Sequence, residues 1–195
     1  GPDENTAELV NWATEHARSR GAPWWKSFFT GKSPKLGGIP HDSYGMTTLS
    51  VRQYVLGIQR KLNVDPSTLL KLQTGGPDGD LGSNEILLSN EKYGAIVDGS
   101  GVIYDPNGLN HEELIRLAKK RAMIAQFDLT KLSPEGYRVL VDEKNVKLPS
   151  GEVVHNGMVF RNTYHLRSQE KFDVFVPCGG RPESIDLASV GKLLR

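Results

Sequence analysis

One stretch in the middle of the chain constrains the fold more than any other. Residues 69–74 indicate a short strand, residues 75–82 are rich in glycine, and residues 83–89 indicate a helix. Residues 95–97 indicate a second strand, which ends in an acidic residue, Asp98. A strand, a glycine turn, a helix and a second strand ending in an acid form the order of a βαβ unit that binds dinucleotides. The stretch therefore predicts an α/β fold.

The glycine turn matches a dinucleotide fingerprint only in part. The pattern G-x-G-x-x-G needs one glycine for the tight turn, one for approach to the pyrophosphate and one for helix packing. Gly79 and Gly82 fit the second and third places, but Pro77 occupies the first. Gly75 and Gly76 stand just before it and could supply the turn. The alternative is a glycine turn that starts a helix and binds no ligand.

Acidic residues in and after the turn bear on the kind of ligand. Asp78 and Asp80 would repel a pyrophosphate unless their side chains point away from it. Asp98 lies 16 residues past Gly82, at the end of the second expected strand, where an acid can bind the ribose hydroxyls of NAD. The alternative for Asp98 is a turn residue before Gly99. The sequence alone leaves both roles of Asp98 open.

The rest of the chain predicts helices at both ends of the dinucleotide unit and a β-rich insertion after it. Apolar spacing and capping residues indicate helices over residues 5–20, 47–62 and 110–121, and residues 183–195 indicate one more. Residues 21–46 form a loop rich in glycine, proline and aromatic residues, either functional or pinned by its aromatics. Short strands are expected at the following positions: 139–141, 146–148, 153–154, 158–160 and 172–177.

Composition argues against several classes of function. The formal net charge is +1, so the basic excess of a nucleic-acid-binding surface is missing. No run approaches the roughly 18 apolar residues of a membrane span. Cys178 is the single cysteine and the histidines are scattered, so we expect no disulfide framework and no metal site. Cys178 is a small buried residue lining a pocket or, as the second interpretation, a nucleophile.

Several motifs, in the same order along the chain, resemble glutamate dehydrogenases. They are the N-terminal run at residues 1–6, the run at 29–39, the stretch 73–86, the sequence Ile103–Leu109 and the run at 176–183. The likeness is to the large NAD-specific enzymes of fungi and protists, and it covers the whole chain. It implies a Rossmann-type doubly wound sheet with an inserted β-hairpin region.

The resemblance implies roles for individual residues. Asp3 matches the catalytic aspartate that shuttles protons to and from the α-amino group and water. Thr47 matches a threonine that helps to hold the nicotinamide carboxamide. The pyrophosphate turn is matched by Pro77, Asp78, Gly79, Asp80, Leu81 and Gly82. Asp98 and Gly99 match the end of the second strand, and Cys178 and Gly179 lie where that family's strand end borders the nicotinamide ring.

The resemblance also implies the reaction and the extent of the active site. L-Glutamate would be oxidised reversibly by NAD to 2-oxoglutarate and ammonia. Residues 1–46 would form a segment of the catalytic cleft, and residues 47–195 most of an NAD-binding domain. The substrate-binding lysines would precede Gly1, so the chain alone is expected to be inactive. The intact enzyme would be a homo-oligomer of the cytoplasm or the mitochondrial matrix.

Two other functions stay open on the sequence. A related dehydrogenase acting on leucine, phenylalanine or valine would share the cofactor fold. A nucleotide-binding or regulatory module without catalysis would keep the fold but would have no need of Asp3.

Overall fold

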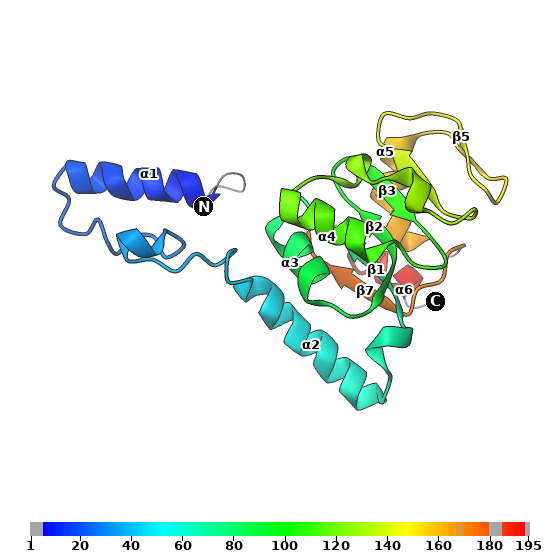
Figure 1. Cartoon of the computed structure of the whole chain (residues 1–195), viewed down its shortest axis with the longest axis horizontal. Coiled ribbons are helices and arrows are strands. Elements are labelled where there is room, and N and C mark those ends of the chain that lie inside the picture. The colour runs from blue at the N-terminus through cyan, green and yellow to red at the C-terminus, as the bar shows by residue number, and fades with distance from the viewer. Residues whose placement is uncertain (1–5, 168, 180–184, 194–195) are drawn as a thin grey trace. The chain divides into compact units, whose positions relative to one another are not determined.

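The computed structural model describes residues 6–167, 169–179 and 185–193. Contacts within the chain divide it into two units, Gly1–Leu49 and Ser50–Arg195, and Figure 1 shows the elements of each. The functional division made from the sequence, with its boundary after residue 46, stays a prediction.

The N-terminal unit consists of one helix and a loop that folds back on it. Helix α1 spans Thr6–Ser19, as the capping-box spacing predicts. The backbone N–H of Ser33 donates to Asn11 Oδ1 at 2.8 Å, and the Arg18 guanidinium lies 5.0 Å from the centre of the Trp25 ring. These contacts hold the aromatic loop on α1.

A five-stranded mixed sheet in the order β4-β3-β2-β1-β7 forms the centre of the second unit. Strand β1 (Leu70–Thr74) pairs in parallel with β2 (Lys92–Val97) on one side and with β7 (Val174–Pro177) on the other. Beyond β2, strands β3 (Gly101–Tyr104) and β4 (Tyr137–Leu140) continue the sheet in antiparallel pairing. The Rossmann-type α/β sheet is confirmed, with an antiparallel edge in which β3 was not expected from the sequence.

Helices pack on both faces of this sheet (Figure 1). On one face, α3 (Asp80–Leu88) and α4 (His111–Lys120) bury apolar side chains with Ile96 and Ile103. On the other face, α5 (Gly157–Thr163) buries Phe160 with the neighbouring strand residues Ala95, Val97 and Val102. Because successive side chains of a strand point to opposite faces, residues 95 to 97 supply both layers.

Shorter elements complete the two units, the first of them in the N-terminal unit and the others in the second. The 3₁₀ helices η1 to η5 span Pro34–Leu36, Pro66–Thr68, Ile124–Gln126, Leu129–Lys131 and Tyr164–Leu166. Within the part of residues 183–195 that the structure describes, helix α6 covers Val190–Leu193.

The inserted hairpin is present, but the expectation for the residues that follow it is wrong. Strands β5 (Val146–Lys147) and β6 (Val153–Val154) pair antiparallel, as predicted. Residues 158–160, expected as a strand, belong to helix α5. The Asn156 side chain accepts the backbone N–H of Val159 at 3.0 Å and so caps this helix. The Asn-Gly pair at 156–157 starts a helix and does not form a hairpin turn.

Helix α2 (Met46–Leu62) forms where the sequence predicts it, but its apolar stripe does not face the core. Tyr54, Ile58 and Leu62 are 76%, 59% and 66% exposed. The polar residues Arg52 and Gln59 are buried instead. The reason is a cluster of opposite charges beneath the helix, which Arg52 and Gln59 complete.

The charges of this cluster come from three other places in the second unit. Lys71 of β1 and Arg52 both pair with Glu85 of α3, each at 2.9 Å. Both also reach Glu91, at 3.4 and 3.1 Å, and the Gln59 amide donates to Glu91 at 2.7 Å. Two positive and two negative charges therefore balance in the interior. Burial alone would raise the pKa of Glu91, but Lys71 and Gln59 hold this pKa at about 2.

We expect Lys71→Met to lower the free energy of unfolding by roughly 3–5 kcal/mol, because it leaves two buried carboxylates with Arg52 as the one cation of the cluster paired to both. Chemical denaturation of the chain, followed by circular dichroism, measures this change. Adding Glu85→Gln to Lys71→Met restores the charge balance and should recover part of the loss.

Lys92→Met is the matched control, since Lys92 is exposed on the neighbouring strand β2. It should change stability by less than about 0.5 kcal/mol. Equal effects of the two lysine substitutions would contradict a structural role for the buried cluster.

Candidate cofactor site

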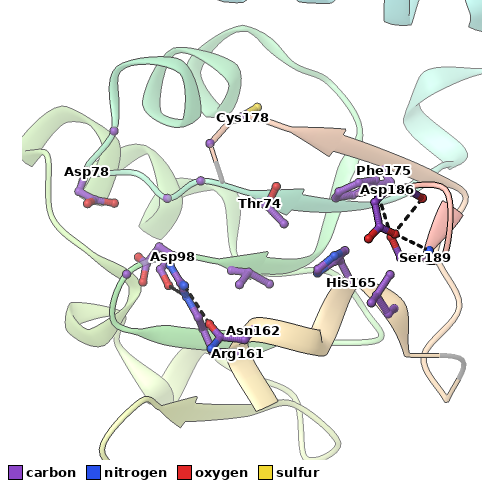
Figure 2. Close-up of a pocket in the computed structure, with 17 residues that line it drawn as sticks. Thr74, Asp78, Asp98, Arg161, Asn162, His165, Phe175, Cys178, Asp186 and Ser189 are labelled. Atoms are coloured by element: carbon purple, nitrogen blue, oxygen red, sulfur yellow. Dashed lines mark hydrogen bonds between the residues drawn. The ribbon is translucent and has the colours of Figure 1, made fainter. Parts of the chain in front are cut away.

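A cavity of about 420 Å³ opens at the carboxyl ends of β1, β2 and β7 (Figure 2). Strand β1 has β2 on one side and β7, a strand from late in the chain, on the other, so the strand order reverses at β1. Ligands of open α/β sheets bind at such a switch point. The lining residues are Thr74, Gly75, Gly76, Asp78, Gly79, Val97, Asp98, Gly99, Arg161, Asn162, His165, Leu166, Phe175, Cys178, Gly179, Asp186 and Ser189.

The glycines of the turn are required by close contacts. Gly75 has a φ of +88°, and a Cβ there would lie 2.5 Å from the carbonyl carbon of Cys178. A Cβ on Gly76 would overlap the Asp98 side chain, and one on Gly82 would overlap the Gly76 carbonyl oxygen. Gly75 and Gly76 thus supply the tight turn, and Gly82 lets helix α3 approach it.

Gly79 differs from the other glycines because its surroundings leave room for a side chain. Its φ is −83°, and a Cβ would lie 3.7 Å from the Gly76 carbonyl oxygen, an ordinary van der Waals distance. Gly79 is the N-cap of α3, so the free N–H groups of the first helical turn follow it. Helix N-termini of this kind bind phosphate groups.

The side chain of Gln73 holds the turn from within the domain. Its amide donates to the carbonyl oxygens of Gly75 at 2.8 Å and Gly82 at 3.2 Å. Gln73 is completely buried, and its Oε1 atom has no hydrogen-bond partner. One side chain therefore joins the first residue of the turn to the first turn of α3. The sequence analysis did not find this residue; its place two residues before the first glycine was the available signal.

The acids of the turn point in different directions. Asp80 pairs with Arg121 at 2.9 Å and does not line the cavity, whereas Asp78 does. Pro77, Leu81 and Gly82 also lie outside the lining and belong to the turn and the helix. Of the six turn residues proposed as cofactor contacts, the structure therefore places Asp78 and Gly79 at the cavity.

Asp98 lies at the predicted place, directly after β2, and its carboxylate is already engaged by the protein. Oδ1 accepts the backbone N–H and the hydroxyl of Ser100, at 2.8 and 2.6 Å, and Oδ2 accepts the N–H of Ile124 at 2.7 Å. Burial raises the pKa of this carboxyl. A carboxylate accepts about four hydrogen bonds, so three protein donors leave room for one from a ligand. Asp98 and Gly99 both line the cavity.

Cys178 and Gly179 border the cavity at the end of β7, as expected. The N–H of Cys178 donates to the Thr74 carbonyl at 2.7 Å and extends the parallel pairing. Burial, aided by the nearby Glu85 carboxylate, raises the pKa of the thiol to about 12. The thiol is therefore protonated at neutral pH, which argues against the nucleophile and favours the buried residue lining a pocket.

Residues from α5 and η5 form a wall of the cavity that the sequence analysis missed. Arg161, Asn162, His165 and Leu166 lie there, and the His165 ring stacks on Phe175 with centroids 6.1 Å apart. The strand expected at 158–160 gave no reason to place these residues together at the cavity. The missed signal was the spacing of Gly157, Phe160 and Tyr164, which suits one face of a helix.

The structure does not test the two remaining predicted site residues, Thr47 and Asp3. Thr47 lies near the start of α2, in the N-terminal unit. Asp3 lies outside the described residues. Their roles stay predictions.

The part of the chain that the structure describes holds neither a metal-binding cluster nor a membrane-spanning helix. Across residues 6–167, 169–179 and 185–193, no three His, Cys, Asp or Glu side chains gather where a metal ion could bind. Within the same ranges, no helix has the length and apolar character needed to cross a membrane.

Relatives of the chain have closely similar sequences. An NAD-specific glutamate dehydrogenase of Neurospora crassa is 76% identical over the whole chain, and a probable NAD-specific glutamate dehydrogenase of Schizosaccharomyces pombe is 69% identical. Glutamate dehydrogenase 2 of Dictyostelium discoideum is 58% identical over 99% of the chain. The chain spans about a fifth of these relatives, 19% of the first and 18% of the others.

Solved structures agree on the fold. Glutamate dehydrogenase 2 of Plasmodium falciparum aligns with 96% of the chain and 41% of its own length, with a TM-score of 0.58 at 16% identity. Another glutamate dehydrogenase of P. falciparum aligns with 84% of the chain and 30% of its own length, with a TM-score of 0.54 at 20% identity.

The sequence model of the glutamate/leucine/phenylalanine/valine dehydrogenases matches residues 37–195. The chain therefore belongs to the glutamate/leucine/phenylalanine/valine dehydrogenase family.

Proposed function

We propose that the chain is the NAD-binding part of an enzyme that oxidises L-glutamate reversibly to 2-oxoglutarate and ammonia. The carrying observation is the glycine cradle at the switch point of the sheet, where Gly75, Gly76 and Gly82 have no room for a side chain. The names of relatives that are 58–76% identical support glutamate over the other amino acids of the family. The names of the two fungal relatives support NAD as the cofactor.

The cavity residues suit a dinucleotide. Gly79 and the following N–H groups of α3 would hold the pyrophosphate. Asp98 would accept a hydrogen bond from the adenosine ribose and would repel a phosphate at its 2′ position. Gly179 and the backbone of Cys178 would border the nicotinamide end of the cofactor, and Asp98 its adenosine end. When bound, NAD supplies the hydride acceptor of the reaction.

The chain's own residues would then position the reactants and move protons. The glycine turn and the N-terminus of α3 would hold the pyrophosphate in the middle of the cofactor, so that the reactive ring faces the substrate. Asp3 would accept and return the protons of the α-amino group and water. Thr47 would hold the nicotinamide carboxamide.

Two further expectations belong to this proposal. We expect the intact enzyme to be a homo-oligomer, which light scattering after size-exclusion chromatography measures. We expect it in the cytoplasm or the mitochondrial matrix, which cell fractionation distinguishes.

Gly79→Ala separates cofactor binding from folding. Because the structure leaves room for the new methyl group, we expect an unchanged melting temperature. The methyl group would, however, keep the pyrophosphate away from the helix N-terminus, and losing one hydrogen bond to a charged group should weaken NAD binding roughly tenfold to hundredfold. Calorimetric titration of the intact enzyme with NAD measures the affinity.

Gly57→Ala is the matched control, since Gly57 lies in α2 with open space around its Cα. It should leave NAD affinity unchanged. An unaltered NAD affinity in Gly79→Ala would contradict the proposed pyrophosphate site.

Asp3→Asn tests the proton shuttle. The amide keeps the shape of the side chain but cannot accept the proton, so we expect kcat to fall by roughly 10²–10⁴-fold. The KM for NAD should stay within about twofold, because Asp3 is not expected to contact the adenosine half. Steady-state kinetics of the intact enzyme give both values, and near-normal turnover would remove Asp3 from the mechanism.

A further inference from the structure

Arg161 brings a positive charge to the part of the cavity that holds Asp98. It comes from helix α5 and lines the cavity. Its Nε donates to the main-chain carbonyl oxygen of Asp98 at 2.7 Å, and its Nη1 donates to Asn162 Oδ1 at 3.1 Å. Figure 2 shows Arg161 and Asp98 lying against each other at one end of the cavity. The guanidinium is therefore fixed against the main chain of Asp98.

The acid at the end of the second strand marks where the adenosine ribose of a bound dinucleotide lies. An acid there favours NAD, because it hydrogen-bonds the 2′-hydroxyl and repels a 2′-phosphate. An arginine there favours NADP, because it pairs with that phosphate, and arginine binds phosphate particularly well. In this chain both kinds of residue line one cavity, and the arginine bonds to the main chain of the acid.

We propose that Arg161 is a specificity-determining residue, a cation beside the ribose 2′ position whose attraction for a 2′-phosphate is overruled by Asp98. The inference rests on the proposed NAD site and adds to it. Preference for NAD then results from the balance of two opposed charges. Removing Asp98 alone should uncover a site for NADP, which requires Arg161.

A double-mutant cycle in the intact enzyme tests this interaction. Asp98→Ser should raise affinity for adenosine 2′,5′-bisphosphate roughly tenfold to hundredfold, the value of a hydrogen bond to a charged group. Adding Arg161→Met should abolish that gain, whereas adding Arg161→Lys should keep much of it, since the charge remains. Affinity for adenosine 5′-monophosphate, which has no 2′-phosphate, should be similar in Asp98→Ser with or without Arg161→Met. Calorimetric titration with the two nucleotides measures these affinities.

Kinetics give a second measurement. With glutamate as substrate, kcat/KM for NADP should rise in Asp98→Ser and fall back when Arg161→Met is added. If melting temperatures show that Arg161→Met prevents folding, Arg161→Gln replaces it, because it removes the charge but keeps polar contacts.

The outcomes separate the inference from the proposed function. A gain in Asp98→Ser that survives the loss of the Arg161 charge would overturn the role of Arg161. No gain at all in Asp98→Ser, in an enzyme that binds NAD, would also overturn it and leave the NAD site intact. A wild-type enzyme that binds no NAD would overturn both.

Discussion

Polar bonds from strand β1 to helix α3 determine where the N-terminal end of that helix lies. Lys71 pairs with Glu85 in the middle of α3, and Gln73 donates to carbonyl oxygens at both ends of the glycine turn. Hydrogen bonds and buried ion pairs are directional, and a partner lost in the interior is costly. An apolar interface would tolerate small shifts of α3, whereas this one fixes the helix along β1. The cradle formed by Gly75, Gly76 and Gly82 depends on that fixed position.

The same cluster explains why α2 buries its polar face. Arg52 and Gln59 complete the charges of Lys71, Glu85 and Glu91, so the helix turns these residues inward. The apolar stripe is left at the surface of the second unit. The charge cluster thus joins α2, β1 and α3 and supports the strand end from which the cavity opens.

One wall of the cavity comes from outside the strand–turn–helix–strand unit at residues 69–98. Helix α5 follows the inserted hairpin and brings Arg161 and His165 to the ends of β1 and β2. Because Arg161 bonds to the main chain of Asp98, the insertion and the acid of the dinucleotide unit are mechanically connected. Cofactor selection then depends on residues far apart in the sequence.

Local sequence signals predicted the elements that local interactions stabilise. The cap at Asn110, the apolar run before Cys178 and the strand–turn–helix order at residues 69–97 all lie where the structure has them. The errors arose where contacts with residues far along the chain, or a capping side chain, determine the structure. The apolar spacing at residues 47–62 predicted helix α2 but not which of its faces is buried, because Glu85 and Glu91, more than 20 residues away, draw the polar face inward. The strand expected at 158–160 rested on three apolar residues, and the cap at Asn156 outweighed them.

The candidate site divides in the same way. Gly79 and Asp98 were predicted because turns and strand ends have short patterns, and Gly179 was predicted from the resemblance. Gln73 and Arg161 were missed because their roles depend on partners that only the fold brings near. Asp80 was assigned to the cofactor, but its nearest charged partner is Arg121, 41 positions further along the chain.

Hydrogen exchange of the intact enzyme with and without NAD tests the central claim most directly, because it locates binding along the chain. The account predicts slower exchange on NAD binding in the glycine turn at residues 75–82, in the loop at 98–101 and in the α5 wall at 159–166. Slower exchange confined to other regions, with these three unchanged, would contradict it.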